Sequence, residues 1–499
     1  MQSALLSPDV IRWKQGDHEL LWQAKTGRSV ALHADTLAQL HTPALAPVRA
    51  RLARLHLLAA SPLPDRRELV PVRSRMVLLL PARPALWAPV PDAHTAGGHA
   101  YRALPLSPVE QRIWSAIDDR RTTEQLAEAV SASLSEVEAL CDRLCAPDVQ
   151  ALQLRDEPLR RLDPTLSRVV GRPRPDNARS VDQHGPQGET DLRTYHQHDI
   201  TDGATHFDDR ETTVAHAHAV PHAMLHGRTY GEQLFAVLAA RGLVPERGLI
   251  AEVGCGTGEM AAAFWRSAAK PELSYLRIDL SPELLKTQAR NAPDTQGQLG
   301  DATALPLADG SVQLLLSNEV IADLCAATAD TPAVPEYLAR YALPPQPPGS
   351  PYNLGAWQLI EELARVLAPG GAAFVSEFGS PDDPPEEATQ LDHPEVSIHF
   401  GHLVRIATAL GLAAELVPLA ELLQADLSAP HLARASYMGL RALCRSQAVH
   451  LAARAWTAAS VADALPEPVE SLHDARCDDP GPGPLITRFW ALLLRKPAA

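Results

Sequence analysis

Three acidic residues in the second half of the chain stand at spacings that suit a nucleoside ligand. Glu252 ends an apolar run in LIAEVGCGTGEM (Leu249 to Met260), just before three closely spaced glycines. Asp279 closes another apolar run, SYLRIDL, and Asp301 follows a third in QLGDATALPL. A strand that enters a glycine-rich turn and then a helix presents free backbone N–H groups to a ligand. These residues predict a nucleotide or nucleoside site.

The glycine spacing favours SAM-type nucleosides over dinucleotides as the ligand. Gly254, Gly256 and Gly258 are spaced G-x-G-x-G, whereas a dinucleotide fingerprint is spaced G-x-G-x-x-G to admit a pyrophosphate. Glu252 would repel a pyrophosphate but suits a cation. S-adenosylmethionine (SAM) carries an ammonium and a sulfonium and no phosphate, so it is favoured. Each of these features taken singly has an alternative that needs no ligand. Asp279 could cap a helix, Asp301 could be a plain turn acid and Glu252 an edge charge. The glycine loop could be a tight turn without ligand.

With these pieces in order, the chain resembles the class I SAM-dependent methyltransferases from about Tyr230 to Pro497. The resemblance implies that Glu252 supports the amino-acid end of SAM through water or loop amides. It implies that Asp279 holds the ribose hydroxyls, that Asp301 contacts the adenine amine, and that the residues after the fourth strand face the methyl group. The expected cofactor contacts are Tyr230, Glu252, Gly254, Cys255, Gly256, Thr257, Gly258, Asp279, Leu280, Asp301, Ala302, Ser317 and Asn318.

Methyl transfer requires an aligned nucleophile and, for some acceptors, a base. Candidate catalytic residues follow the fourth and fifth expected strands, where wound folds place ligands. They are Glu319, Glu377 and His399, with His402 nearby. A pair of carboxylates would suit a guanidinium acceptor. The alternatives are that Glu377 is a loop acid and that the histidines cap or pack a helix.

The segment SNEVIADL, followed by SEFG and DHPEVSIHFGHL, is similar to the MidA-like methyltransferases. That resemblance implies an arginine of a protein as the acceptor. The match is partial, because Ala322-Asp323-Leu324 stands where the family has Asp-Ala-Leu. The N/D-P-P-Y/F signature of amino methylation and a Pro-Cys nucleophile are absent, and the net charge is −15. Nucleic acid is therefore excluded as a partner, since its phosphates demand basic patches.

Two further motifs surround these residues. A proline-rich stretch from Ala327 to Leu354 predicts a lid or substrate wall with Tyr337, Tyr341 and Tyr352 as contacts, or else an inert loop.

His218, His222 and His226 are four residues apart and could share a helix face, but Pro221 interrupts the helix and no acid or cysteine is interleaved. We therefore predict no metal site.

A chain of 499 residues predicts more than one domain. Strands and helices alternate in the second half, which predicts a seven-stranded Rossmann-like α/β sheet. Helices from Ser107, Thr122 and Ser133, followed by the strand VQALQLR, resemble a winged helix. The expected domains are a small α+β unit at 1–70, a winged-helix-like domain at 71–156, a polar linker at 157–200 and a methyltransferase domain at 201–499.

The role of the front half is open at this stage. Its third helix, SLSEVEALCDRL, carries Glu136, Glu138 and Asp142 against Arg143, which disfavours a DNA groove. Dimerisation, a substrate cap and peptide binding remain. The pattern TTEQLAEAV with SEVEALCDRL is similar to PqqD-like domains, and this resemblance implies a peptide substrate held by strand addition.

The cysteines and the hydropathy bear on location. Of the six cysteines only Cys141 and Cys145 lie close together, so there is no disulfide framework. No stretch reaches the roughly 18 apolar residues of a membrane helix. We expect a cytoplasmic protein with no membrane partner and a homodimer as one candidate assembly. The predicted function is methyl transfer from SAM to an O or N nucleophile, on a peptide or protein side chain. The alternatives are a small-molecule acceptor and a non-catalytic SAM-binding scaffold.

Overall fold

The chain divides into two units. The computed structural model describes residues 6–15, 18–61, 63–74, 76–95, 98–156, 221–390, 393–447, 457–465, 467–476 and 485–498. Unit 1 comprises residues 1–176, 430–475 and 479–482, and unit 2 comprises 177–429, 476–478 and 483–499. The expected linker at 157–200 and His218 lie outside the described residues.

Unit 2 is built on one eight-stranded sheet. Seven strands follow the order β11-β10-β9-β12-β13-β20-β17, and the short β16 pairs with β13. Their bounds are β9 Gly248–Val253, β10 Leu273–Asp279, β11 Gln296–Leu299, β12 Val312–Asn318, β13 Leu367–Ser380, β16 Ile398–His399, β17 Ala413–Pro418 and β20 Phe489–Arg495. Strands β11, β10, β9, β12 and β13 are parallel, and β20 runs antiparallel between β13 and β17. The carboxyl ends of the parallel strands therefore meet at one edge.

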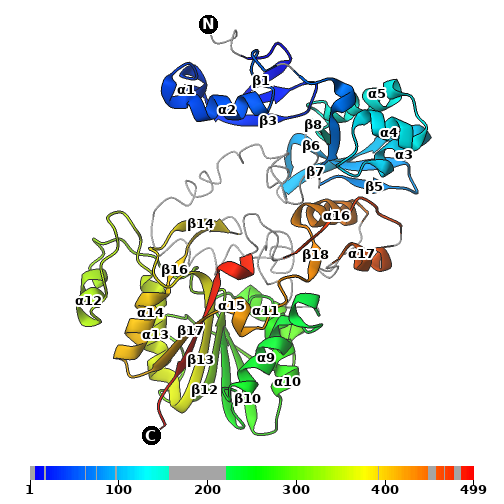
Figure 1. The fold of residues 1–499 in the computed structure, drawn as a ribbon. Helices are drawn as coiled ribbons and strands as arrows, with labels where there is room; N and C mark the ends of the chain where they lie inside the picture. The colour runs from blue at the N-terminus through cyan, green and yellow to red at the C-terminus, as the bar shows by residue number, and fades with distance from the viewer. Residues whose placement is uncertain are drawn as a thin grey trace. The chain divides into compact units, whose positions relative to one another are not determined.

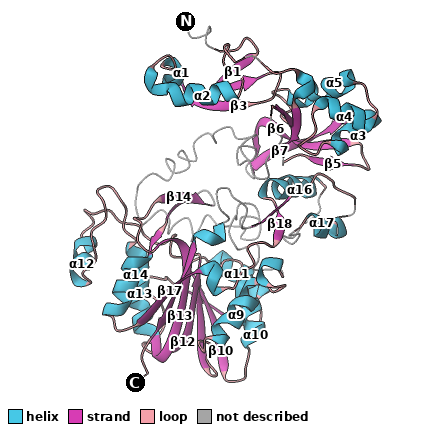
Figure 2. Cartoon of the chain, in the orientation of Figure 1, coloured by secondary structure: helices cyan, strands magenta, loops and turns pink. Residues whose placement is uncertain are grey.

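Helices cover both faces of this sheet (Figure 1, Figure 2). The helices of unit 2 are α9 Tyr230–Ala240, α10 Glu259–Ala268, α11 Pro282–Asn291, α12 Ala333–Arg340, α13 Leu354–Val366, α14 Phe400–Ala409 and α15 Leu419–Leu422, and a small hairpin joins β14 Glu387–Gln390 to β15 His393–Val396. Leu234 and Phe264 pack with Phe374 on the face covered by α9 and α10. Trp357 and Leu403 pack on the face covered by α13 and α14. Alternate strand residues thus enter two separate cores, as buried parallel sheets require.

A Pro-Gly-Gly segment, Pro369 to Gly371, follows helix α13 in unit 2. The helix α13 ends at Val366, and this Pro-Gly-Gly segment lies inside β13. A Cβ on Gly371 would lie 2.8 Å from the carbonyl oxygen of Val312, so the glycine permits close approach of β13 to β12.

The described part of unit 1 contains two three-stranded sheets with helices and two separate strand pairs. The first sheet is β1 Val10–Gln15, β2 His18–Gln23 and β3 Ser29–His33, with α1 Ala34–Ala38 and α2 Ala46–Arg54. The second is β5 Leu78–Leu80, β6 Ala85–Thr95 and β7 Gly98–Pro105, and β4 Val70–Arg73 pairs with β8 Leu152–Arg155. The helices α3 Pro108–Ala116, α4 Thr123–Val130 and α5 Leu134–Cys145 each begin with a capping box. These caps explain why the three helix starts were readable from sequence.

A segment between β17 and β20 belongs to unit 1. It contains β18 Pro430–Leu432, α16 Arg434–Ser446, α17 Ala458–Ala464 and β19 Asp474–Arg476. Leu440 and Val461 share a core cluster with Leu78 and Leu80 of β5. Trp114 of α3 donates its indole N–H to Ser471 Oγ at 3.0 Å. The expected span of 201–499 is therefore interrupted by residues that complete the other unit.

Candidate active site

The glycine loop joins β9 to α10 at the carboxyl edge of the sheet. Gly254, Gly256 and Gly258 have φ of +68°, +51° and +84°, a left-handed backbone that L side chains rarely adopt. Among the described residues, no atom lies within 4 Å of where a Cβ on Gly256 would stand. A Cβ on Gly258 would lie 3.0 Å from the Cα of Gln288, so α11 packs directly against the loop. The loop is open on one side and supported on the other.

Asp279, the last residue of β10, is buried beside this loop. Its Oδ1 accepts from the Ser281 amide at 2.9 Å, and its Oδ2 accepts from Gln288 Nε2 at 2.7 Å. Burial raises the pKa of Asp279 to about 6, while these donors and the amides of Cys255 and Leu280 act in the opposite sense. The carboxylate therefore meets a cluster of N–H donors at the tip of the strand.

Gln288 is a site residue that the sequence analysis missed. It is fully buried, and its Nε2 also donates to the Gly256 carbonyl at 3.0 Å. Its Oε1 accepts from Nη1 of the buried Arg277 at 3.0 Å. The amide thus connects the glycine loop, Asp279 and β10. An amide in a helix after the second strand carries no motif, so only its contacts identify it.

Glu252 lies inside the sheet and faces the neighbouring strand. It is 2% exposed, and its carboxylate accepts a hydrogen bond from the hydroxyl of Tyr275. Burial raises the pKa of Glu252 to about 7, and Tyr275 and Arg277 act to lower it. Its backbone carbonyl accepts from the thiol of Cys255 at 3.4 Å. Glu252 therefore supports the loop from within the core.

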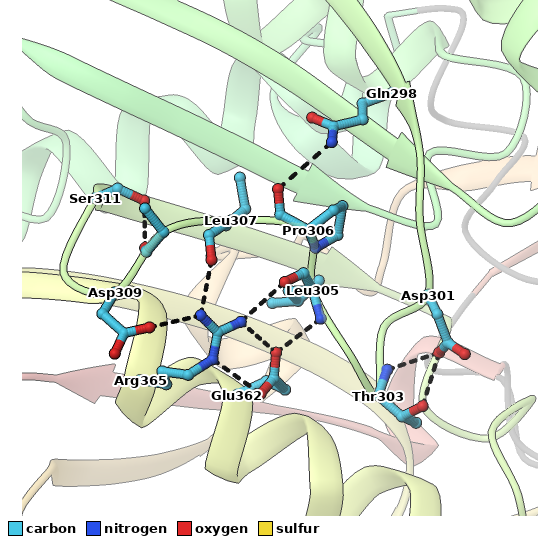
Figure 3. Close-up of polar contacts among 11 residues, drawn as sticks. Gln298, Asp301, Thr303, Leu305, Pro306, Leu307, Asp309, Ser311, Glu362 and Arg365 are labelled. Carbon is cyan, nitrogen blue, oxygen red and sulfur yellow. Dashed lines mark hydrogen bonds and ion pairs between the residues drawn. The ribbon is translucent and has the colours of Figure 1, made fainter.

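Asp301 begins the loop between β11 and β12 (Figure 3). Its Oδ1 accepts from both the amide and the hydroxyl of Thr303 at 2.8 Å. The neighbouring Ala302 is 7% exposed and packs in the core under α13. The amide of Gly300 donates to the Asp279 carbonyl at 3.0 Å, so the two acids lie at the ends of adjacent strands.

The end of β12 carries a buried polar group. Asn318 Oδ1 accepts from the hydroxyl of Tyr230, the first residue of α9, and from Ser376 Oγ at 2.7 Å. Tyr230, an expected SAM or substrate contact, is fully buried, and its hydroxyl donates to Asn318. The hydroxyl of Ser317 is buried without a hydrogen-bond partner among the described residues. An unsatisfied buried hydroxyl at this edge is a feature that a ligand could satisfy.

Two of the three candidate catalytic residues lie near each other. Glu319 has φ of +55°, a strained backbone at the tip of β12, and its Oε1 accepts from Asn318 Nδ2 at 3.1 Å. Glu377 is 3% exposed and accepts from the amides of Ala322 and Phe378 at 3.2 and 3.0 Å. Burial raises the pKa of Glu377, as do the charges of Glu395, Glu319 and Asp323.

His399 occupies a helix-capping position. Its Nδ1 accepts from the His402 amide at 3.1 Å at the start of α14, and the two rings stack with centroids 4.2 Å apart. His402 Nε2 lies 2.9 Å from the Pro344 carbonyl, and burial lowers the pKa of His402 to about 4. The described contacts match the packing and capping alternative for both histidines.

The proline-rich stretch is tied down at its base. Ala327 and Tyr352 exchange two backbone hydrogen bonds of 2.8 Å. The hydroxyls of Tyr337 and Tyr341 donate to Glu361 of α13, and the Tyr352 hydroxyl accepts from the Gln346 amide at 3.0 Å. All three tyrosine hydroxyls that we expected as substrate contacts therefore have partners within the stretch or α13.

His222 and His226 do not share a helix face. His222 and His226 flank a three-residue 3-10 helix, Ala223–Leu225. His222 Nδ1 accepts from the Met224 amide at 3.0 Å, and His226 Nε2 lies 2.6 Å from the Gln424 carbonyl. Within the part of the chain that is described, no group of three His, Cys, Asp or Glu side chains could hold a metal ion.

The strand order and the loop are those of a Rossmann-like class I methyltransferase, and comparison with known proteins agrees. Residues 251–340 match the family model described as a methyltransferase domain. The chain therefore contains a class I SAM-dependent methyltransferase domain, and SAM is the cofactor of this class.

Individual relatives cover part of the chain. A malonyl-[acyl-carrier protein] O-methyltransferase from Methylococcus capsulatus is 32% identical over 155 residues, 30% of this chain and 44% of the relative. The biotin biosynthesis bifunctional protein BioHC from Cellvibrio japonicus is 28% identical over 153 residues, 30% of this chain and 23% of the relative. The chain thus matches less than half the length of either relative.

Among solved structures, the [4+2]-cyclase SpnF is 16% identical with a TM-score of 0.31, over 54% of this chain and 81% of the other.

Proposed function

We propose that this chain transfers a methyl group from SAM to an O or N nucleophile on a peptide or protein side chain. The observation that carries the proposal is the meeting of the glycine loop, Asp279 and Asp301 at one sheet edge, within the residues that match a methyltransferase domain. SAM supplies a methyl group activated by a sulfonium. The acceptor's lone pair forms the new bond to carbon as the C–S bond breaks and its electron pair stays on sulfur.

The residues present fit this cofactor. The open side of Gly256 lets a ligand reach the backbone, and the unsatisfied Ser317 hydroxyl stands at the same edge. In the proposed arrangement Asp279 accepts the ribose hydroxyls, and Asp301 accepts from the adenine amine. Glu252, Cys255, Thr257, Leu280, Ala302 and Asn318 complete the cofactor side.

Calorimetry with SAM and with its demethylated product S-adenosylhomocysteine (SAH) tests the cofactor assignment. Asp279→Ala should abolish measurable binding of both, because the ribose hydroxyls lose a buried acceptor. Absence of heat with either ligand in the wild-type protein would refute the proposal.

The charges at the acceptor side bear on the substrate. The charges of Glu319, Asp323 and Glu395 raise the pKa of Glu377, so four acidic side chains lie within electrostatic reach of one another. An acceptor that enters as a carboxylate anion would be repelled there, whereas a neutral or cationic nitrogen would not. This favours a nitrogen acceptor. The named activity of the Methylococcus relative, O-methylation of a malonyl group on acyl carrier protein, supports the second candidate, an oxygen acceptor.

A labelling experiment separates the acceptor classes. Extract incubated with methyl-labelled SAM and the protein is divided by a size filter. Label on macromolecules supports the peptide or protein reading, and label in the small fraction supports a small-molecule acceptor. SAM binding without label in either fraction supports the non-catalytic scaffold.

We propose that unit 1 recognises the acceptor or a second copy of the chain, with a winged-helix-like arrangement of α3 to α5. Exposed Asp142 of α5 pairs with Arg66 at 2.6 Å, and Arg143 pairs with Glu110 at 2.6 Å. Such paired cations support the exclusion of nucleic acid. Size-exclusion chromatography with light scattering tests the homodimer.

A cytoplasmic location is likewise proposed, and it is supported by the buried, disulfide-free thiols of Cys141, Cys145 and Cys255. No helix in the described ranges is long and apolar enough to cross a bilayer.

A further inference from the structure

Side chains of helix α13 hydrogen-bond to the loop that carries Asp301 (Figure 3). Glu362 and Arg365 stand one turn apart on α13 and reach the loop between β11 and β12. Glu362 Oε2 accepts from the Leu305 amide at 2.7 Å. Arg365 donates to the carbonyls of Leu305 and Leu307 at 2.8 and 2.7 Å. These three backbone groups belong to no strand of the sheet.

The two side chains also fix each other. Arg365 Nε and Nη2 donate to the two oxygens of Glu362 at 3.0 and 2.6 Å, and Nη1 donates to Asp309 Oδ1 at 2.8 Å. The carbonyl of Arg365 accepts from the Gly310 amide at 3.0 Å. A planar guanidinium with donors on several sides can satisfy such an arrangement, and an ammonium cannot.

The segment that α13 contacts, Leu305 to Leu307, follows Asp301 closely in the chain. Leu305 is 4% exposed and packs with Ala302 in the core under α13. The Ala304 amide donates to the Asp301 carbonyl at 3.2 Å, so a short turn joins Asp301 to Leu305. A shift of Leu305 would therefore displace the Asp301 carboxylate.

We propose that Glu362 and Arg365 are positioning residues that hold Asp301 where it recognises the adenine amine. The inference rests on the proposed SAM site and adds residues to it that touch no ligand. In this inference the position of the adenine-binding residue depends on α13, a helix that carries none of the nucleotide-binding motifs.

The test measures the affinity of SAH and of its analogue in which purine replaces adenine, by calorimetry. The wild-type protein should bind the deamino analogue about tenfold less tightly, because the analogue cannot donate to Asp301. Arg365→Gln and Glu362→Ala should bind SAH about tenfold more weakly and lose most of this discrimination. Asp301→Ala gives the discrimination expected when the carboxylate is absent.

Two further variants keep the test decisive. Arg365→Lys retains the charge and should resemble Arg365→Gln, because a single ammonium cannot replace the several N–H donors of the guanidinium. Arg340→Ala removes a 3.1 Å ion pair between α12 and Glu361, the neighbour of Glu362 on α13. This variant should change the affinity for neither SAH nor the purine analogue.

Unchanged discrimination in folded Arg365 variants would overturn the inference, as would an equal loss for both ligands, which indicates general destabilisation. A wild-type protein that binds neither ligand would refute the proposed function instead.

Discussion

At the scale of single residues, we propose that the protonation of Asp279 controls ligand binding at the site. Burial raises its pKa from the ordinary 3.8 to about 6. A raised acid pKa favours the protonated form in the fold, so the unliganded protein loses stability as the pH rises from about 4 through about 6. The ribose hydroxyls need the ionised form, so ligand binding has the opposite dependence.

We therefore expect SAH affinity to fall about tenfold per pH unit below pH 6. Calorimetry from pH 5 to about 8 measures the profile. Asp279→Asn should bind weakly with no step near 6, which separates this titration from that of Glu252 near 7. A wild-type affinity that is independent of pH would contradict the assignment.

Gln288 should determine the pH at which the SAH affinity changes. Gln288→Glu keeps an acceptor for Arg277 but places a second carboxylate beside Asp279. Like charges raise each other's pKa, so the midpoint of the SAH pH profile should move above 6. Gln288→Leu, which leaves Arg277 without one acceptor, should also lower the free energy of unfolding by about 1–3 kcal/mol. An unshifted midpoint in Gln288→Glu would show that the amide does not influence the acid.

At the scale of elements, the end of β12 holds Glu319 in a strained backbone. Glycine accepts φ of +55° without the clash of a Cβ. Glu319→Gly should therefore raise the free energy of unfolding by about 1 kcal/mol, while methyl transfer falls because the carboxylate is lost. Chemical denaturation and single-turnover methyl transfer measure the two effects.

Gln424→Gly is the matched control, because Gln424 has φ of +53° after α15, outside the stretches that carry the proposed cofactor and acceptor residues. It should gain similar stability and keep its activity. A Glu319→Gly protein with full activity would remove this residue from the catalytic candidates.

The elements that positioned the site were largely predictable. The apolar runs ending in Glu252, Asp279 and Asn318 are strands, because a parallel sheet buried on both faces demands continuous apolar residues. The hairpin of β6 and β7 was not predicted, since ALWAPVPDAHT contains two prolines and little alternation. Helix α13 carries none of the cofactor motifs, so its contacts with the Asp301 loop could not be predicted from the sequence.

At the scale of the whole molecule, the return of the chain into unit 1 has a measurable consequence. Leu440 of α16 is fully buried against Leu78 and Leu80. Leu440→Ala should cost unit 1 about 2–5 kcal/mol. Hydrogen exchange should accelerate in β5 to β7, more than three hundred residues earlier in the chain, and leave β9 to β13 protected.

Leu238→Ala in α9, at an equally buried position in unit 2, should give the reverse pattern. If Leu440→Ala loosened only the unit 2 sheet, residues 430–475 would have to be reassigned.

The sequence alone determined the methyl donor. Glycine spacing and the acids at strand ends are local features, and a strand that runs into a left-handed glycine turn has few other uses. Tertiary structure decided what those residues contact: Gln288 under Asp279, Tyr275 on Glu252, Arg365 behind Asp301, and α16 in the other unit. Periodicity states which face of an element is apolar, but the partner of that face depends on the path of the whole chain.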